Sequence, residues 1–265
     1  MATTFQVRIA NEEKTYAVQA AQAAFAVMTA LESHLSRFRV SSDISQAAQL
    51  TPGEKLRVSE PVFACLQIAR QMELATEGGF SATPAALQSQ SAAPHWTLLP
   101  GEFSVLCERG KLEFDLGAIG KGFALDRMAV VLREWDCPAF LLVAGGSSIL
   151  AGDPPANHPG WSCGLGDDNA AQRHWLKQCS LSGSGLAVKG KHIFDPRTGQ
   201  PAQREGRIWA LCDTGAESDA LSTAAMVLNK TELKAVLARN PAWLIFLNEL
   251  ETWRCLGSRG LPARA

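Results

Sequence analysis

Apolar residues recur along this chain at two different spacings, which separate expected helices from expected strands. Between 17 and 36 the sequence is rich in alanine, and Phe25, Met28, Leu31 and Leu35 follow the spacing of a helix with one buried face. Residues 139–144 form a short, continuously apolar run bounded by proline and glycine, which is typical of a buried strand. The same patterns predict further helices at 60–76, 121–135, 217–229 and 231–239, and further strands at 103–107, 112–116, 147–152, 161–166, 175–181, 207–212, 243–248 and 252–256.

Strands and helices in this prediction do not alternate regularly, so the order of elements favours an α+β fold. A chain of 265 residues suits one large domain or two small ones. Residues 81–100 are rich in Ala, Ser, Gln and Pro, which predicts a surface excursion within a domain rather than a linker between domains.

Composition excludes several classes of protein. The 25 basic residues against 26 acidic ones argue against a nucleic-acid binder held by a basic surface. The seven cysteines include no C-x-x-C pair, and we expect them to be reduced and buried. The first residues form no signal peptide, and the longest apolar run, 20–31, is too short to cross a bilayer. We therefore expect no membrane insertion and a cytoplasmic location.

The first candidate for chemistry is the stretch from Asp115 to Gly122, Asp-Leu-Gly-Ala-Ile-Gly-Lys-Gly, between an expected strand and an expected helix. Its glycines allow close backbone approach, the helix start offers N–H groups, and Lys121 adds positive charge, which together favour an anionic ligand such as phosphate. Alternatively, the glycines make only a tight turn that Asp115 caps.

The second candidate is the pair Asp219 and Thr223 at the start of an expected helix. Four residues apart, they project from one helical face. Carboxylate, hydroxyl and carbonyl oxygens suit a hard divalent cation, above all Mg²⁺. The alternative is that Asp219 favours the helix dipole and Thr223 belongs to the core.

The third candidate is His192, which precedes an Asp195-Pro196-Arg197-Thr198-Gly199 turn. Placed at a strand end, this histidine would accept a proton from a substrate hydroxyl, or it is structural. A Gly145-Gly146 pair after the apolar strand either admits a flat ligand or forms a hairpin turn.

Taken in order, these segments resemble the ApbE family, the FAD:protein FMN transferases. The resemblance lies in the Asp115 motif, the strand ending in Gly-Gly, the His-Ile-x-Asp-Pro-Arg-Thr-Gly from His192 and the Ser-Asp-Ala-Leu-Ser-Thr-Ala from Ser218. The segment from Leu35 to Ser45 is similar to an N-terminal element of that family. Together the matches run from about 20 to 230, and their shared order is more specific than any one motif.

The resemblance implies a single ApbE-like domain over 1–265, with mixed or antiparallel sheets flanked by helices. It further implies an enzyme that binds FAD, cleaves its pyrophosphate with Mg²⁺, and transfers FMN to a threonine hydroxyl of an acceptor flavoprotein, releasing AMP. On this basis Phe38, Phe80, Ser81, Asp115, Lys121 and Ile193 would contact FAD. The Ala118 carbonyl, Asp219 and Thr223 would hold Mg²⁺, with Asp219 serving catalysis through the metal, and His192 would be the base that activates the acceptor.

Several positions depart from the family pattern. Phe38 stands where the family has tyrosine, Val40 where it has proline, and Ser81 where it has aspartate. Two alternative functions follow: an FAD-binding protein without transfer activity, and an FAD pyrophosphatase that yields FMN and AMP. Ser81-Ala82-Thr83 also resembles a flavinylation acceptor, although alignment with the family motif explains Thr83 more simply.

Overall fold

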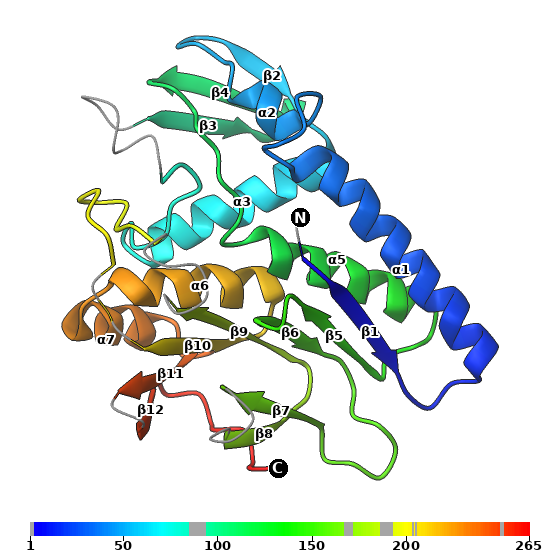
Figure 1. Ribbon diagram of the computed structural model, residues 1–265. Coiled ribbons are helices and arrows are strands. Elements are labelled where there is room, and N and C mark those ends of the chain that lie inside the picture. Colours follow the sequence, from blue (N-terminus) through cyan, green and yellow to red (C-terminus); the bar gives the residue numbers. More distant parts are fainter. Residues whose placement is uncertain are drawn as a thin grey trace.

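The structure is a computed structural model, and it describes residues 3–84, 94–166, 172–185, 193–202, 204, 206–249 and 252–265. Its centre is a seven-stranded sheet in the order β1-β5-β6-β9-β10-β11-β12, in which every neighbouring pair is antiparallel (Figure 1). The strands are β1 (Phe5–Ile9), β5 (Phe140–Ala144), β6 (Ser148–Ala151), β9 (Cys179–Gly185), β10 (Arg207–Cys212), β11 (Leu244–Glu249) and β12 (Thr252–Leu256).

Helices cover one face of this sheet. Helix α5 (Gly120–Glu134) packs on β5 and β6, and α6 (Gly215–Val227) packs on β9 and β10. Outside them, α1 (Lys14–Leu35) packs against α5 and α3 (Glu60–Ala75) against α6, as Figure 1 shows. Helix α7 (Lys230–Arg239) follows α6. The sheet and the two inner helices therefore form the framework that carries the site.

Smaller elements lie at both sides of this framework. Beyond α3, strands β2 (Lys55–Arg57), β3 (His95–Leu99) and β4 (Ser104–Arg109) form a sheet in the order β2-β4-β3, near the short helix α2 (Asp43–Ala47) and a 3₁₀ turn (Pro100–Glu102). A hairpin of β7 (Trp161–Leu165) and β8 (Gln172–Leu176) lies at the opposite side of the central sheet (Figure 1).

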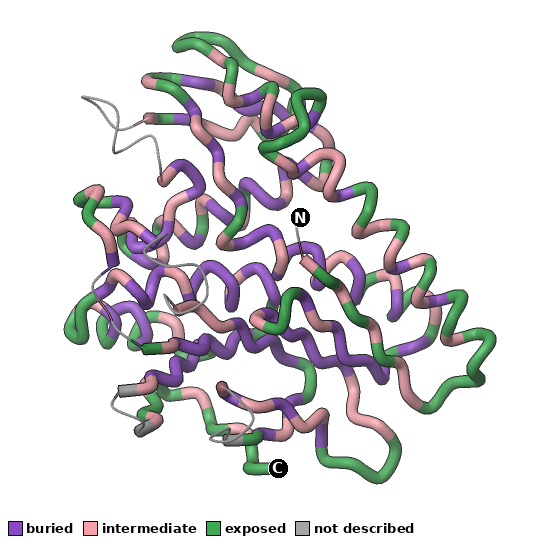
Figure 2. Tube along the Cα trace, viewed as in Figure 1, coloured by how far each residue is buried: buried purple, intermediate pink, exposed green. Residues whose placement is uncertain are grey.

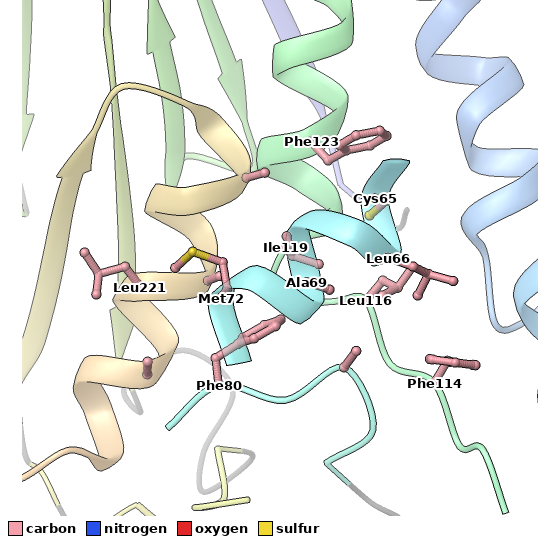
Figure 3. Close-up of a cluster of buried hydrophobic side chains, with 14 of the residues drawn as sticks. Cys65, Leu66, Ala69, Met72, Phe80, Phe114, Leu116, Ile119, Phe123 and Leu221 are labelled. Atoms are coloured by element: carbon pink, nitrogen blue, oxygen red, sulfur yellow. The ribbon is translucent and has the colours of Figure 1, made fainter. Parts of the chain in front are cut away.

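Hydrophobic packing explains why these layers hold together. Figure 2 shows buried residues concentrated in the central sheet, α5 and α6, while α1 exposes its outer side. The largest apolar cluster joins α3 to α5 and α6, and Figure 3 shows Met72, Phe80 and Ile119 grouped around α3. Such interiors are close-packed, so the inner helices have little freedom to shift relative to each other.

The structure confirms the α+β class and places every predicted helix within about three residues of its predicted ends. Two predicted strands are wrong. Residues 112–116 form no strand. Leu112, Phe114 and Leu116 are buried, so the alternation of apolar and polar residues that suggested a strand arises from their packing against the core. The predicted strand 175–181 is the end of β8 and the start of β9, separated at Gln178, where φ is 45°.

The predicted excursion at 81–100 also differs in part from the structure. Residues 85–93 lie outside the described residues, but His95–Leu99 forms strand β3, and Trp96 is buried. The strand β1, which sequence patterning missed, pairs with β5 in full register.

Three smaller expectations are settled by the structure. All seven cysteines are free, and six of them are buried, Cys255 being the exposed one. Gly145 and Gly146, with φ of 60° and 68°, form the hairpin turn between β5 and β6, the second of the two alternatives. Among the described residues, no helix combines the length and apolar character that crossing a membrane requires.

Candidate functional site

The candidate site is built around a buried ion pair between the two inner helices. Asp219 lies in the second turn of α6, and Lys121 lies in the first turn of α5, 98 residues earlier in the chain. The Lys121 Nζ lies 3.0 Å from both Asp219 carboxylate oxygens. The aspartate side chain is 4% exposed and the lysine 23%. The fold thus brings two of the three candidate motifs into direct contact.

Two further donors hold the Asp219 carboxylate. The Ser148 Oγ, at the start of β6, donates to Oδ1 at 2.9 Å. The Gly122 backbone N–H donates to Oδ2 at 3.1 Å; it is one of the N–H groups at the start of α5 that have no partner within the helix. The carboxylate therefore caps the start of α5 and accepts hydrogen bonds from two separate elements and an ammonium group.

Hydroxyl groups line the interface between α6 and β9. The Thr223 Oγ1 donates to the Asp219 carbonyl at 3.3 Å and lies 3.3 Å from the Ser184 Oγ. Deeper along the same strand and helix, Ser180 and Ser182 each lie 2.8 Å from the Ser218 Oγ. Asp219 and Thr223 therefore share one face of α6, as predicted, and this face is polar although it is covered by the sheet.

Helix α6 is fixed to α5 by a second aspartate. The Asp126 carboxylate accepts hydrogen bonds from the Gly215 N–H at 2.6 Å and the Ala216 N–H at 2.9 Å, at the start of α6. Burial raises the pKa of the Asp126 carboxyl to about 7, although these two N–H donors act in the opposite direction. Asp219 and Asp126 thus connect the same two helices in reciprocal directions.

Asp115 organises the turn that precedes α5. Its Oδ1 accepts the Gly117 N–H at 2.8 Å, so Asp115 caps a tight turn, an arrangement that is compatible with an anion site at the start of α5 as well as with a purely structural turn. Its Oδ2 forms an ion pair with Arg37 at 2.9 Å, and its backbone N–H donates to the Ala82 carbonyl at 2.8 Å. Segments near residues 37, 82 and 115, far apart in the sequence, therefore meet at this turn.

A carboxylate from α3 reaches the 80–83 segment. The Glu73 Oε1 accepts hydrogen bonds from the Ser81 Oγ at 3.0 Å and the Ala82 N–H at 2.9 Å, and its Oε2 forms an ion pair with Arg70. Although Ser81 replaces the aspartate of the family pattern, an acidic group thus lies against this segment. Thr83 is 4% exposed, which makes it a poor candidate for an acceptor hydroxyl.

The remaining predicted FAD contacts differ sharply in exposure. Phe38 is 84% exposed, and its ring lies 4.9 Å from the Arg37 guanidinium carbon. Phe80 is 1% exposed and packs in the cluster between α3 and α6 (Figure 3), so its side chain contributes to the core instead of a ligand surface. Ile193 is also buried. His192 lies outside the described residues.

The segment that follows His192 is a tight, ion-paired hairpin. Ala202 donates its N–H to the Ile193 carbonyl, and Arg197 bonds both carboxylate oxygens of Asp195 while also contacting Glu232 of α7. Arg197 holds the pKa of the Asp195 carboxyl below its usual value. The predicted turn at 195–199 is thus confirmed, and it is tied to α7.

Cation-binding capacity at this site rests on oxygen donors. The described residues contain no group of three or more His, Cys, Asp or Glu side chains arranged for a metal. Asp219 and Thr223 lie one turn apart on α6, and Ala118 lies two residues before the start of α5, whose Gly122 N–H bonds the Asp219 carboxylate. Carboxylate, hydroxyl and carbonyl oxygens are the donor types that suit a hard cation. The Lys121 ammonium group supplies the positive charge beside the Asp219 carboxylate.

Two cavities lie away from this ion pair. One of about 360 Å³ borders the 193–202 hairpin and the end of α6, and one of about 270 Å³ lies between α2 and the 111–114 segment. Neither of these two cavities is lined by Asp219 or Lys121.

Sequence reasoning missed three residues that support the site: Ser148, Arg37 and Glu73. Ser148 had a detectable signal, since it begins the strand two residues after the Gly145-Gly146 pair. Ser180, Ser182 and Ser184 also alternate along one strand face while Ser218 and Ser222 lie four residues apart. Arg37 and Glu73 have no comparable signal, because their partners are distant in the sequence.

These features define an α+β protein with a buried carboxylate and ammonium pair where two inner helices cross. The chain belongs to the ApbE family, whose model matches residues 1–246. It is 22% identical over 170 residues to the FAD:protein FMN transferase of Escherichia coli strain K12, covering 58% of this chain and 48% of that protein. It is 27% identical over 151 residues to the FAD:protein FMN transferase of Treponema pallidum, covering 49% of this chain and 42% of that protein. The chain spans about half the length of these curated relatives.

Solved structures extend the similarity to nearly the whole chain. The flavin transferase ApbE from Vibrio cholerae superposes with a TM-score of 0.79 at 19% identity, covering 97% of this chain and 95% of that one. The flavinyl transferase ApbE from Pseudomonas stutzeri, in its apo form, superposes with a TM-score of 0.80 at 21% identity, covering 98% of this chain and 95% of that one. The predicted ApbE-like fold is thereby confirmed.

Proposed function

We propose that this protein transfers FMN from FAD to a threonine hydroxyl of an acceptor flavoprotein, with Mg²⁺, and releases AMP. The observation that carries the proposal is the contact between Lys121 and Asp219, because it unites the expected phosphate-binding motif with the expected cation-binding motif. The family membership and the names of the related proteins support the same activity.

The residues of this chain would bind and orient the pyrophosphate of FAD. Lys121 supplies a positive charge on a long side chain that is partly exposed, so it can turn from Asp219 toward a phosphate oxygen. The glycine-rich start of α5 adds backbone N–H groups and the positive end of the helix dipole. Asp115, held by Gly117 and Arg37, keeps the preceding turn in shape.

Asp219, Thr223 and the Ala118 carbonyl would hold the cation. Mg²⁺ bound there would neutralise the negative charge that develops on the pyrophosphate oxygens. Since Asp219 is buried and hydrogen-bonded on two sides, its carboxylate is already oriented before a ligand arrives. Preorganised charge of this kind costs little reorganisation during the reaction.

His192 is the proposed base for the acceptor hydroxyl. It directly precedes Ile193 and the ion-paired hairpin, which ties this part of the chain to α7. A base within hydrogen-bond reach of the threonine would take its proton as the oxygen attacks the phosphorus of the FMN moiety, with AMP as the leaving group. Ile193, Phe38 and Ser81 remain the proposed neighbours of FAD, and Phe80 would contribute through its backbone alone.

The test is incubation of the purified protein with FAD and Mg²⁺, with and without a flavoprotein acceptor that contains the target threonine. We expect covalent flavin fluorescence on the acceptor after denaturing electrophoresis, together with stoichiometric AMP. Asp219→Ala should abolish AMP release, and His192→Ala should reduce acceptor labelling while FAD still binds.

Other outcomes would replace the proposal. FMN and AMP formed equally well without an acceptor would indicate an FAD pyrophosphatase. FAD that stays bound and intact would indicate a binding protein. Unchanged turnover in Asp219→Ala would remove the cation assignment, and loss of FAD binding in His192→Ala would make that histidine structural.

A further inference from the structure

Ser148 is the first residue of β6, and its side chain is fully buried under α6. The next residue, Ile149, faces the opposite cluster between the sheet and the β7-β8 hairpin. The hydroxyl of Ser148 therefore lies in an interior layer, where an unsatisfied polar group would be costly. Its Oγ donates to the Asp219 Oδ1 at 2.9 Å.

The three donors to Asp219 differ in how freely they move. Ser148 is held by a central strand that pairs on both sides, and the Gly122 N–H belongs to the backbone of α5. Lys121, by contrast, reaches the carboxylate with a long and partly exposed side chain. When the lysine turns to a phosphate, the serine and the glycine remain to fix the carboxylate.

We propose that Ser148 is a positioning residue for Asp219. Its hydroxyl fixes the rotation of the carboxylate, so that the oxygen facing the cation is presented in one orientation. This inference rests on the proposed function, because it assigns Asp219 the role of cation ligand. Groups that orient a metal ligand in this way typically change metal affinity about 10- to 100-fold when removed.

The chain offers a matched control in Ser182. This serine is also fully buried, lies on the neighbouring strand β9, and forms a 2.8 Å hydrogen bond to Ser218 of α6. No hydrogen bond between Ser182 and the Asp219 side chain is found among the described residues. Replacing either serine with alanine therefore removes one buried hydroxyl from the same interface, but only Ser148→Ala releases the carboxylate.

The experiment measures Mn²⁺ binding to the full chain by electron paramagnetic resonance of the free ion, for wild type, Ser148→Ala, Ser148→Thr, Ser182→Ala and Asp219→Ala. We expect Ser148→Ala to bind Mn²⁺ about 10-fold more weakly. Ser182→Ala should match wild type, and Ser148→Thr, which keeps the hydroxyl, should recover most of the affinity. Urea unfolding of each variant checks that it is folded.

A second readout separates positioning from general damage. In Ser148→Ala the Mg²⁺ concentration for half-maximal FAD turnover should rise about 10-fold, while the rate at saturating Mg²⁺ stays near that of wild type. Equal losses in Ser148→Ala and Ser182→Ala would overturn the proposal, since a softened interface would then explain both.

The outcomes also distinguish this inference from the proposed function. Wild-type Mn²⁺ affinity in Ser148→Ala, together with lost affinity in Asp219→Ala, would refute the role of Ser148 and leave the function standing. Unchanged affinity in Asp219→Ala would refute the cation site itself, and the role of Ser148 with it.

Discussion

Gly122 of α5 and Gly215 of α6 lie in backbone contact. A Cβ built on Gly122 would stand 1.9 Å from the Gly215 carbonyl oxygen, and one built on Gly215 would stand 2.4 Å from the Gly122 carbonyl oxygen. This closeness lets the Gly122 N–H reach Asp219 and lets Asp126 reach the start of α6. The site geometry therefore depends on two residues that carry no side chain.

The first prediction is that Gly122→Ala displaces α6 from α5. The methyl group would collide with backbone, which cannot rotate away as a flexible side chain can, and overpacking of this kind costs about 1–3 kcal/mol or more. Urea unfolding should show the loss, and AMP release should fall with it. Gly260→Ala, where nothing lies within 4 Å, is the control. A Gly122→Ala protein as stable as the control would contradict the close crossing of these two helices.

The second prediction concerns the charge balance of the ion pair. Lys121→Met leaves the buried Asp219 carboxylate without the lysine ammonium group. Removing one partner of a buried ion pair lowers the free energy of unfolding by up to about 3–5 kcal/mol. The double variant Lys121→Met with Asp219→Asn should regain part of this stability in urea unfolding, because no uncompensated charge remains. Its FAD turnover should not return. Strictly additive losses in stability would show that the two groups are not coupled.

The third prediction is a pH dependence set by Asp126. Its carboxyl has a raised pKa of about 7 in the folded protein, so between pH 4 and 7 the folded state holds a proton that the unfolded state has lost. The stabilising contribution is present at low pH and disappears as pH rises through 7. The free energy of unfolding of wild type relative to Asp126→Asn should therefore fall from pH 5 to pH 8, and a constant difference would disprove the assignment.

The fourth prediction has the opposite sign. Arg197 lowers the pKa of Asp195, so this pair stabilises the protein above the ordinary aspartate range and loses its effect as pH falls toward 3. Arg197→Gln should lower stability by about 1 kcal/mol at pH 7, since the groups are partly exposed, and by less near pH 3. Urea unfolding of wild type and Arg197→Gln at pH 7 and near pH 3 measures the two differences in stability. Glu232→Gln, which keeps the Asp195 pair, should show the smaller change at pH 7.

Local patterning predicted much of this fold because most helices have one apolar face and clear ends. Helix α3, for example, begins at Glu60 followed by proline, and α7 has a capping box between Asn229 and Glu232 that sharpens its start. Patterning failed where burial did not coincide with strand pairing. Leu112, Phe114 and Leu116 alternate as a strand would, but their backbone follows a loop beside the core.

The candidate site was predictable as motifs but not as an arrangement. Asp219 and Thr223 share a helix, so their spacing alone placed them together, while the contact with Lys121 depends on how two helices cross. Arg37 and Glu73 were missed for the same reason, because a contact between distant elements leaves no periodic trace in the sequence. The exposure of Phe38 and the burial of Phe80 likewise depend on tertiary packing.

The pairing of β1 with β5 has a consequence for how the chain assembles during synthesis. Phe5 lies opposite Ala144, so the first strand leaves the ribosome long before its partner exists. Between the two strands come α1, α2, α3, the separate β2-β4-β3 sheet and α5. Long-range strand pairing is slow and leaves apolar faces unprotected while it waits. During synthesis α1 and α3 therefore emerge before α5 and α6, the helices on which they pack, and α6 with Asp219 emerges only after β9 and β10.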